Sequence, residues 1–222
     1  VARRQRQMCI RDRAYILGQQ GFWKLDLEVA PHTLIPRPDT ELLVETALDL
    51  LPASPARVLD LGTGSGAIAL ALASERPAWH ITAVDRVLEA VALAERNRQR
   101  LQLDNVHVLT SHWFSALDGQ RFDLIISNPP YIAAGDVHLG QGDVRFEPES
   151  ALVAGVDGLD DIREIIQAAP QHLNAGGQLM LEHGYDQAAA VRQLLLDAGF
   201  EQVESRKDLG THERITLGRL PC

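Results

Sequence analysis

Four residues with the means to do chemistry stand together near the middle of the chain, Asn128, Pro129, Pro130 and Tyr131. They follow an apolar run, residues 122–127, that is typical of a buried strand. Two prolines remove two backbone N–H donors and fix φ, so the strand has to end here with its last carbonyls pointing into a cleft. The Asn128 amide and those carbonyls can then hold an NH2 group from two sides. Such a grip suits a planar amide or an exocyclic base amine, whose delocalised lone pair must be aligned with an electrophilic carbon.

The tetrapeptide alone does not settle this chemistry, because a plain strand-ending turn would also explain it. A second segment, residues 58–66 (VLDLGTGSG), has the pattern of a ligand-binding turn. A buried strand leads through three alternating glycines into a helix, and glycines permit both a tight turn and close approach of a ligand to the backbone. The residues expected to bind a ligand here are Asp60, Gly62, Thr63, Gly64, Ser65 and Gly66.

The acid that precedes the glycines indicates which ligand this is. Dinucleotide-binding turns have the spacing GxGxxG, whereas this turn has GxGxG after Asp60. A carboxylate at that place would repel a pyrophosphate but would suit the cationic amino group of S-adenosylmethionine, directly or through water. Asp85 ends the next expected strand, where its carboxylate can accept hydrogen bonds from both ribose hydroxyls. We therefore expect S-adenosyl-L-methionine as the cofactor and keep a dinucleotide as the weaker alternative.

These residues have to be positioned by alternating strands and helices. Apolar runs predict strands at residues 57–61, 80–84, 106–109, 122–127, 178–182, 200–206 and 213–217. Helices are expected at residues 67–74, 88–101, 160–171 and 187–198, with one more that starts near Asp39 as its N-cap and carries Glu41 in its first turn. The fold class is therefore α/β, with a doubly wound, mostly parallel seven-stranded sheet. The last two strands lack an intervening helix and should form an antiparallel hairpin at the edge, and residues 14–34 should form a short N-terminal β-hairpin.

The composition excludes several classes of protein. The net charge is −9, and because residues 1–13 hold five arginines and one acid, residues 14–222 carry −13. A body with no basic run is a poor partner for a long nucleic acid duplex, so we expect no stable nucleic-acid binding. No apolar run reaches the roughly 18 residues that would span a bilayer. Cys9 and Cys222 lie far apart and form no metal-ligand spacing, so we expect no metal and a reducing cytoplasmic location. Separately, we expect a monomer.

The combination of the glycine turn, the strand ending at Asp85 and NPPY resembles the class I S-adenosylmethionine-dependent methyltransferases, which have a Rossmann-like fold. More narrowly, the chain is similar to the release factor glutamine methyltransferases, the PrmC or HemK family. The similarity includes four further segments, residues 34–41 (LIPRPDTE), 142–148 (GDVRFEP), 181–184 (LEHG) and 213–218 (ERITLG), and Trp113 with Phe114.

The resemblance implies a role for each residue of the tetrapeptide. The Asn128 side chain and the Pro129 carbonyl would accept hydrogen bonds from the NH2 of a substrate glutamine, and Tyr131 would pack against the amide plane. The glycine turn, Asp85, Trp113 and Asn128 itself would line the cofactor. The implied catalytic residues are Asn128, Pro129 and Tyr131, and the implied substrate-binding residues are these three and Pro130. The methyl group would pass from sulfonium to nitrogen by in-line displacement, with no histidine, cysteine or lysine as a base.

The implied partner is a peptide chain release factor, methylated on the glutamine of its Gly-Gly-Gln motif. Two alternative substrates stay open, a glutamine of a ribosomal protein and the N6 amine of adenine in DNA or RNA. A homologue that binds the cofactor without turnover is the third alternative. The resemblance also implies a long helical domain before the hairpin, and in its place this sequence has the arginine-rich residues 1–13. We expect residues 1–13 to be a disordered or foreign leader, residues 14–38 a hairpin and linker left from a substrate-docking region, and residues 39–222 the methyltransferase domain.

Several residues have a plain structural interpretation beside the functional one. Trp113 could simply cover the sheet, and His183 could satisfy a local hydrogen bond. Arg37 lies between two prolines and could hold that turn. His112 stands beside Trp113 where relatives commonly place an acid for the adenine amine, so that contact could come from the backbone instead. Residues 136–161 hold seven acids and one arginine, which is typical of a solvated face and would also suit a basic partner.

Overall fold

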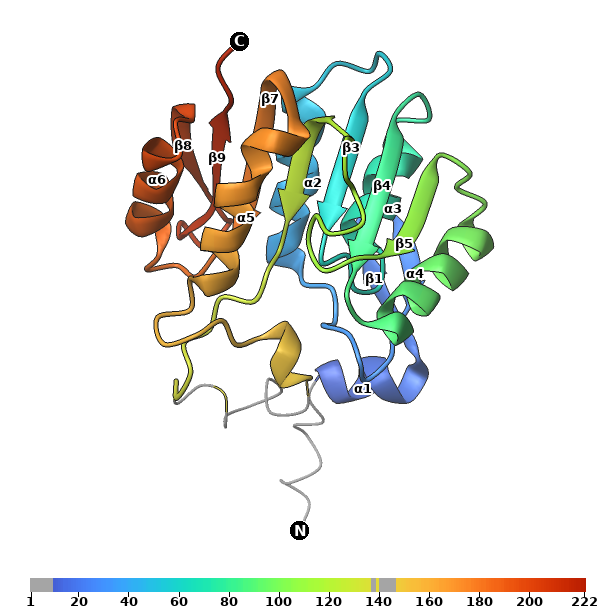
Figure 1. Cartoon of the computed structure of the whole chain (residues 1–222). Coiled ribbons are helices and arrows are strands. Elements are labelled where there is room, and N and C mark those ends of the chain that lie inside the picture. Colours follow the sequence, from blue (N-terminus) through green and yellow to red (C-terminus); the bar gives the residue numbers. More distant parts are fainter. Residues whose placement is uncertain (1–9, 137–138, 140–146) are drawn as a thin grey trace.

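A seven-stranded sheet forms the centre of the molecule, with the order β5-β4-β3-β6-β7-β9-β8 (Figure 1). This computed structural model describes residues 10–136, 139 and 147–222. The strands are β3 Arg57–Leu61, β4 His80–Asp85, β5 Val106–Thr110, β6 Phe122–Ser127, β7 Leu173–Glu182, β8 Glu201–Lys207 and β9 Glu213–Arg219. Strands β3 to β7 are parallel, whereas β9 runs antiparallel to both β7 and β8. The doubly wound, mostly parallel sheet and its antiparallel C-terminal hairpin are therefore confirmed.

Helices cover both faces of this sheet. The helices are α2 Glu41–Leu50, α3 Ala67–Glu75, α4 Leu88–Leu101, α5 Asp160–His172 and α6 Ala188–Asp197. Successive residues of β3 point to opposite faces, so Val58 belongs to the core with α2 and α3 while Leu59 and Leu61 belong to the core with α5 and α6. Every residue of α3 from Ala67 to Ala73 is buried, which fixes the glycine turn that precedes this helix.

The N-terminal hairpin is confirmed as β1 Gln19–Phe22 and β2 Leu25–Glu28, which pair only with each other among the described strands. Its Phe22 and Leu27 are buried in the same core as α2 and α3. A short helix, α1 Ile10–Leu17, precedes the hairpin and crosses the boundary expected after residue 13. The rest of the expected leader, residues 1–9, lies outside the described residues.

The start of α2 differs from the expectation that Asp39 caps it. A 3-10 turn, η2 Pro38–Thr40, comes first, and neither η2 nor α2 has a side-chain cap. Pro38 at the start of the turn places Asp39 inside it, so its carboxylate cannot lie at the N-cap position. Glu41 is in the first turn of α2 as expected, and its carboxylate accepts a hydrogen bond of 2.8 Å from the backbone N–H of Trp23.

Strand β7 begins at Leu173 rather than at Gln178, because the segment expected as a turn joins the sheet with a register shift against β6. None of the described helices is long and apolar enough to cross a membrane.

Candidate functional site

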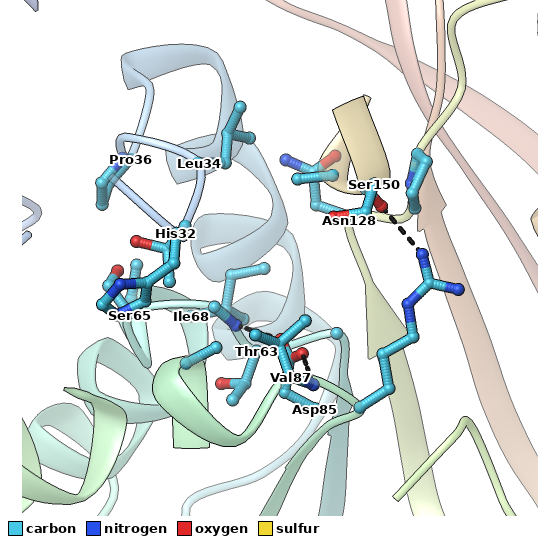
Figure 2. Close-up of a pocket in the computed structure, with 18 of the residues that line it drawn as sticks. His32, Leu34, Pro36, Thr63, Ser65, Ile68, Asp85, Val87, Asn128 and Ser150 are labelled. Carbon is cyan, nitrogen blue, oxygen red and sulfur yellow. Dashed lines mark hydrogen bonds between the residues drawn. The ribbon is translucent and has the colours of Figure 1, made fainter. Parts of the chain in front are cut away.

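A pocket opens at the carboxyl ends of β3, β4 and β6, where parallel α/β sheets commonly bind ligands. The empty space that it encloses, counted together with the open space at its mouth, is about 940 Å³. The walls come from the glycine turn, from the ends of β4 and β5, from the segment after the hairpin and from the NPPY tetrapeptide. Figure 2 shows His32 and Leu34 on one side of the pocket and Asn128 across from them.

The glycine turn holds three residues in the left-handed region, Gly62, Gly64 and Gly66, with φ of 69°, 57° and 87°. A Cβ on Gly66 would come within 2.9 Å of the Leu70 side chain, and a Cβ on Gly62 would lie 3.4 Å from the Trp113 ring. Only glycine combines these φ angles with such close neighbours at low cost. At Gly62 and Gly64 the backbone is therefore presented to the pocket without a side chain in the way.

Asp85 is the last residue of β4 and lies in the wall of the pocket (Figure 2). One carboxylate oxygen accepts a hydrogen bond of 2.9 Å from the backbone N–H of Gly64, and the other accepts one of 2.9 Å from Val87. Each carboxylate oxygen has a second lone-pair direction, so Asp85 can still accept bonds from a diol. This geometry fits the ribose contact expected from the sequence.

Asp60 lies beneath the turn rather than in the pocket wall. The carboxyl group is fully buried, and Oδ2 accepts hydrogen bonds from the Thr63 hydroxyl at 2.6 Å and from the Ala69 N–H at 3.2 Å. Burial raises the pKa of Asp60 to about 7, although the Thr63 and Ala69 bonds lower it in part. In this position Asp60 orders the turn from below, so a direct contact with a ligand is not part of the observed geometry.

Trp113 has the structural role that the sequence left open, and its position is also compatible with the functional one. Its ring is buried in the core with α5 and α6, and it also lines the pocket beside Gly62. Trp113 takes the unusual φ of 44°, and its carbonyl accepts a hydrogen bond of 2.8 Å from the Ser111 hydroxyl. His112 lines the pocket as well, and its ring lies 3.5 Å from the Glu164 carboxylate.

A second pocket adjoins the first, and Asn128 lines both of them. Pro130 faces the first pocket, whereas Pro129 and Tyr131 face the second. The Asn128 Nδ2 donates a hydrogen bond of 3.2 Å to the Thr40 hydroxyl, which leaves Oδ1 to accept one from a ligand. The structure thus places the amide oxygen of Asn128 at the junction of the two pockets.

The backbone of Tyr131 is fixed by the segments that precede α5 and α6. Gln187 donates a hydrogen bond of 3.0 Å to the Tyr131 carbonyl, and a Cβ on Gly158 would lie only 2.3 Å from that oxygen. The Tyr131 hydroxyl lies 3.4 Å from a carboxylate oxygen of Glu182, the last residue of β7. Burial and the Glu182 charge raise the pKa of Tyr131, so its hydroxyl stays protonated at neutral pH.

The sequence did not assign roles to Thr40, Glu182 or Gln187, although the first two belong to segments quoted for the resemblance. No local pattern could have joined them to the tetrapeptide, because the contacts connect η2, the end of β7 and the start of α6. His183 is buried, its Nδ1 lies 2.8 Å from the Gly184 carbonyl and its Nε2 lies 2.7 Å from the Thr216 hydroxyl. Its structural interpretation is therefore favoured.

Arg37 forms an ion pair of 2.6 Å with Glu147 and lines both pockets. This contact holds two loops together at the mouth of the site. In the acidic segment, Asp157 and Asp160 both pair with Arg163. Arg145, the single arginine of that segment, lies outside the described residues. Within the described part of the chain, no group of three or more acidic, histidine or cysteine side chains could hold a metal ion.

Comparison with known proteins shows which family the sequence matches. Residues 38–143 match the model of the methyltransferase small domain. The chain is 73% identical over 209 residues to the release factor glutamine methyltransferase of Pseudomonas aeruginosa, which covers 94% of this chain and 76% of that protein. It is 59% identical over 206 residues to the release factor glutamine methyltransferase of Escherichia coli, with 93% and 74% covered.

Solved structures share the fold at much lower identity. A methyltransferase from Pyrococcus furiosus superposes with a TM-score of 0.70 at 21% identity, over 100% of both chains. The catalytic domain of hMettl16, in complex with an RNA hairpin of the MAT2A 3′UTR, gives 0.73 at 19% identity, over 89% of this chain and 76% of that one. These likenesses establish the fold alone.

Proposed function

The chain belongs to the release factor glutamine methyltransferases, and we propose that its acceptor is the side-chain amide of the glutamine in the Gly-Gly-Gln motif of a peptide chain release factor. The observation that carries this proposal is the position of Asn128, whose Oδ1 is left free to accept a bond at the junction of the two pockets. A planar NH2 group held there in its own plane would present the face of its nitrogen, and so the lone pair, to the first pocket.

The cofactor of this family is S-adenosyl-L-methionine, and the residues of the first pocket fit it. Asp85 offers two carboxylate oxygens to a ribose, and the glycine turn offers open backbone beside Trp113. When bound, the cofactor supplies an electrophilic methyl group on a sulfonium. We propose that Gly62, Gly64 and Asp85 contact it directly. Asp60 and Gly66, which do not line the pocket, shape the turn.

The tetrapeptide orients the acceptor. Asn128 Oδ1 and the Pro129 carbonyl would each accept one N–H of the glutamine amide, which turns the nitrogen lone pair toward the first pocket. Tyr131, on the second pocket, would pack against the amide plane. The gain comes from holding the two reacting atoms in line, and after transfer the product nitrogen can lose its proton to water. No side-chain base is required.

Adenine N6 in RNA is the second candidate, because its NH2 group is planar as well. Enzymes that flip a base need stacking surfaces and a positively charged channel. Residues 14–222 carry a net charge of −13, which opposes binding of a polyanion. A protein is therefore the favoured substrate.

We also propose that the enzyme acts as a monomer, in the compartment where translation takes place.

The test offers the purified protein and methyl-labelled cofactor to three substrates, which are a release factor, its Gly-Gly-Gln variant with alanine in place of glutamine, and total RNA. We expect label in the first substrate alone. Equal labelling of the release factor and its alanine variant would refute the proposed acceptor, and label in RNA alone would favour the second candidate.

A further inference from the structure

Glu182 is a buried carboxylate that lies directly behind the tetrapeptide. It is 1% exposed at the end of β7, and its Oε1 accepts the long hydrogen bond from Tyr131. Its Oε2 is buried and completes no hydrogen bond within the described residues. The hydroxyl of Thr40 nevertheless lies near enough to lower the pKa of this carboxyl group. An ionisable group with one open acceptor therefore lies beside Thr40, the residue that binds Asn128.

The direction of the Asn128 amide depends on what Thr40 does. An asparagine amide can be turned by half a rotation, with its oxygen and nitrogen exchanged. A hydroxyl can either accept from Nδ2 or donate to Oδ1, so Thr40 alone would permit both orientations. Only the first orientation leaves Oδ1 free for the NH2 group of a substrate. The second would present an NH2 group to an NH2 group, and no hydrogen bond could form.

We propose that Glu182 is a positioning residue that fixes the direction of the Asn128 amide through Thr40. An ionised carboxylate can only accept, so it draws the Thr40 hydroxyl proton toward its open oxygen. Thr40 Oγ1 must then accept from Asn128 Nδ2, as observed at 3.2 Å, and Oδ1 is left for the substrate. A neutral carboxyl group could donate to Thr40 instead, and the hydroxyl could then donate to Oδ1. This inference rests on the proposed function, because it assumes that the substrate donates an N–H to Asn128.

The charges around Glu182 make its ionisation sensitive to pH near neutrality. Burial is the largest influence and raises its pKa to about 7, and Asp39 of η2 acts in the same direction. Arg214 of β9 and the hydroxyls of Thr40 and Tyr131 act in the opposite direction. The ionised form is the active one, so turnover should be present above this pKa and should be lost as the pH falls through it.

The test compares the Glu182→Gln variant with the wild type in methyl transfer to a release factor. Both the release factor and the cofactor are present at saturating concentration. The variant keeps the shape of the side chain but can donate as well as accept. We expect kcat to fall by about tenfold or more at pH 8, with the dissociation constant of the cofactor unchanged. The wild type should lose kcat between about pH 8 and 6, and the variant should not. Glu45→Gln, the same change at an exposed residue of α2, should behave as the wild type.

A second pair of variants separates positioning from folding. Thr40→Val removes the hydroxyl and should abolish the acid limb, whereas Thr40→Ser keeps the hydroxyl and should keep both the rate and the limb. Thermal unfolding of Glu182→Gln should be no easier than that of the wild type, because a buried charge has been removed. An unchanged acid limb in Glu182→Gln would overturn the inference while wild-type transfer to the release factor still supports the function. A wild type that labels no release factor would instead refute the proposed function.

Discussion

Asn128 lies where the two pockets meet, and one side of its amide is already bound to Thr40. In the proposed reaction its free oxygen holds one N–H of the substrate. Asn128→Ala removes that acceptor, and we expect kcat/KM to fall by about 100-fold or more. The affinity for the cofactor, measured by calorimetry, should change by less than about threefold, because the glycine turn and Asp85 remain.

Asn174→Ala is the matched control for this prediction. Asn174 lies at the start of β7, away from the pockets at the carboxyl ends of the strands, and its side chain bonds to Asp123. It should leave the rate of transfer unchanged. A normal rate in Asn128→Ala would remove the role assigned to this residue.

Asp60 shows how a single buried carboxylate links stability to pH. Its pKa in the folded state is about 7 against a normal value of 3.8, so the folded state holds the proton more tightly than the unfolded state does. The ionised form therefore destabilises the fold, and this penalty grows as the pH rises from about 4 to about 7 and is complete above that. Asp60→Asn removes the charge. Relative to the wild type, its free energy of unfolding should improve by up to roughly 4 kcal/mol between pH 4 and pH 8.

Urea unfolding of both proteins across that pH range checks this prediction. A difference between the two proteins that does not change with pH would show that Asp60 is ionised as easily in the folded chain as in the unfolded one.

At the scale of elements, the turn before α5 positions the loop that carries Tyr131. Gly158 has φ of 75°, and a Cβ there would lie 2.3 Å from the Tyr131 carbonyl. Gly158→Ala must therefore move the tetrapeptide, and we expect methyl transfer to fall by about tenfold or more. Gly135→Ala is the matched control, because Gly135 has a φ of 90° but no atom within 4 Å of the added Cβ. An equal loss of activity in the two variants, relative to the wild type, would show that backbone strain rather than the clash with Tyr131 decides the outcome.

The hairpin and the glycine turn are joined by one side chain of α4. Buried Asn97 donates to the Ser65 carbonyl at 2.9 Å and to the Glu28 carbonyl at 3.0 Å, and it accepts from the Glu28 N–H at 2.8 Å. Asn97→Ala leaves these groups without partners, so we expect a loss of about 1–3 kcal/mol in unfolding free energy and a weaker affinity for the cofactor. Thermal unfolding and calorimetry measure the two effects.

Gln99→Ala changes an exposed amide on the same helix and should alter neither quantity. An Asn97→Ala protein with unchanged cofactor affinity would show that the hairpin and the turn are independent.

At the scale of the whole molecule, the sequence predicted the seven strands and a cleft where the strand over residues 122–127 ends. This was possible because the alternation of apolar runs with glycines and prolines is a local signal. The proximity of Asn128, Thr40 and Glu182 could not be predicted from the sequence. These residues belong to three distant segments, and no local pattern indicates that the fold brings η2 and the end of β7 together. The failed cap at Asp39 has a similar cause, because Pro38 favours a 3-10 turn before the helix.

The N-terminal hairpin is packed against the rest of the molecule. It shares a hydrophobic core with the seven-stranded sheet, through Phe22 and Leu27. We propose that residues 14–38 support the site as well as linking it to whatever precedes them, and that residues 39–222 form the methyltransferase domain. The curated relatives extend beyond the matched region, since this chain covers 76% and 74% of the two described above.

The position of the transferred methyl group tests the central claim most directly. A release factor is incubated with the enzyme and S-adenosyl-L-methionine, digested, and mapped by fragment mass spectrometry. The geometry at Asn128 predicts a single methyl group on the side-chain amide nitrogen of the Gly-Gly-Gln glutamine, and none when Asn128→Ala replaces the wild type. A methyl group on any other residue, or the same yield from both enzymes, would contradict the proposed grip on the glutamine amide.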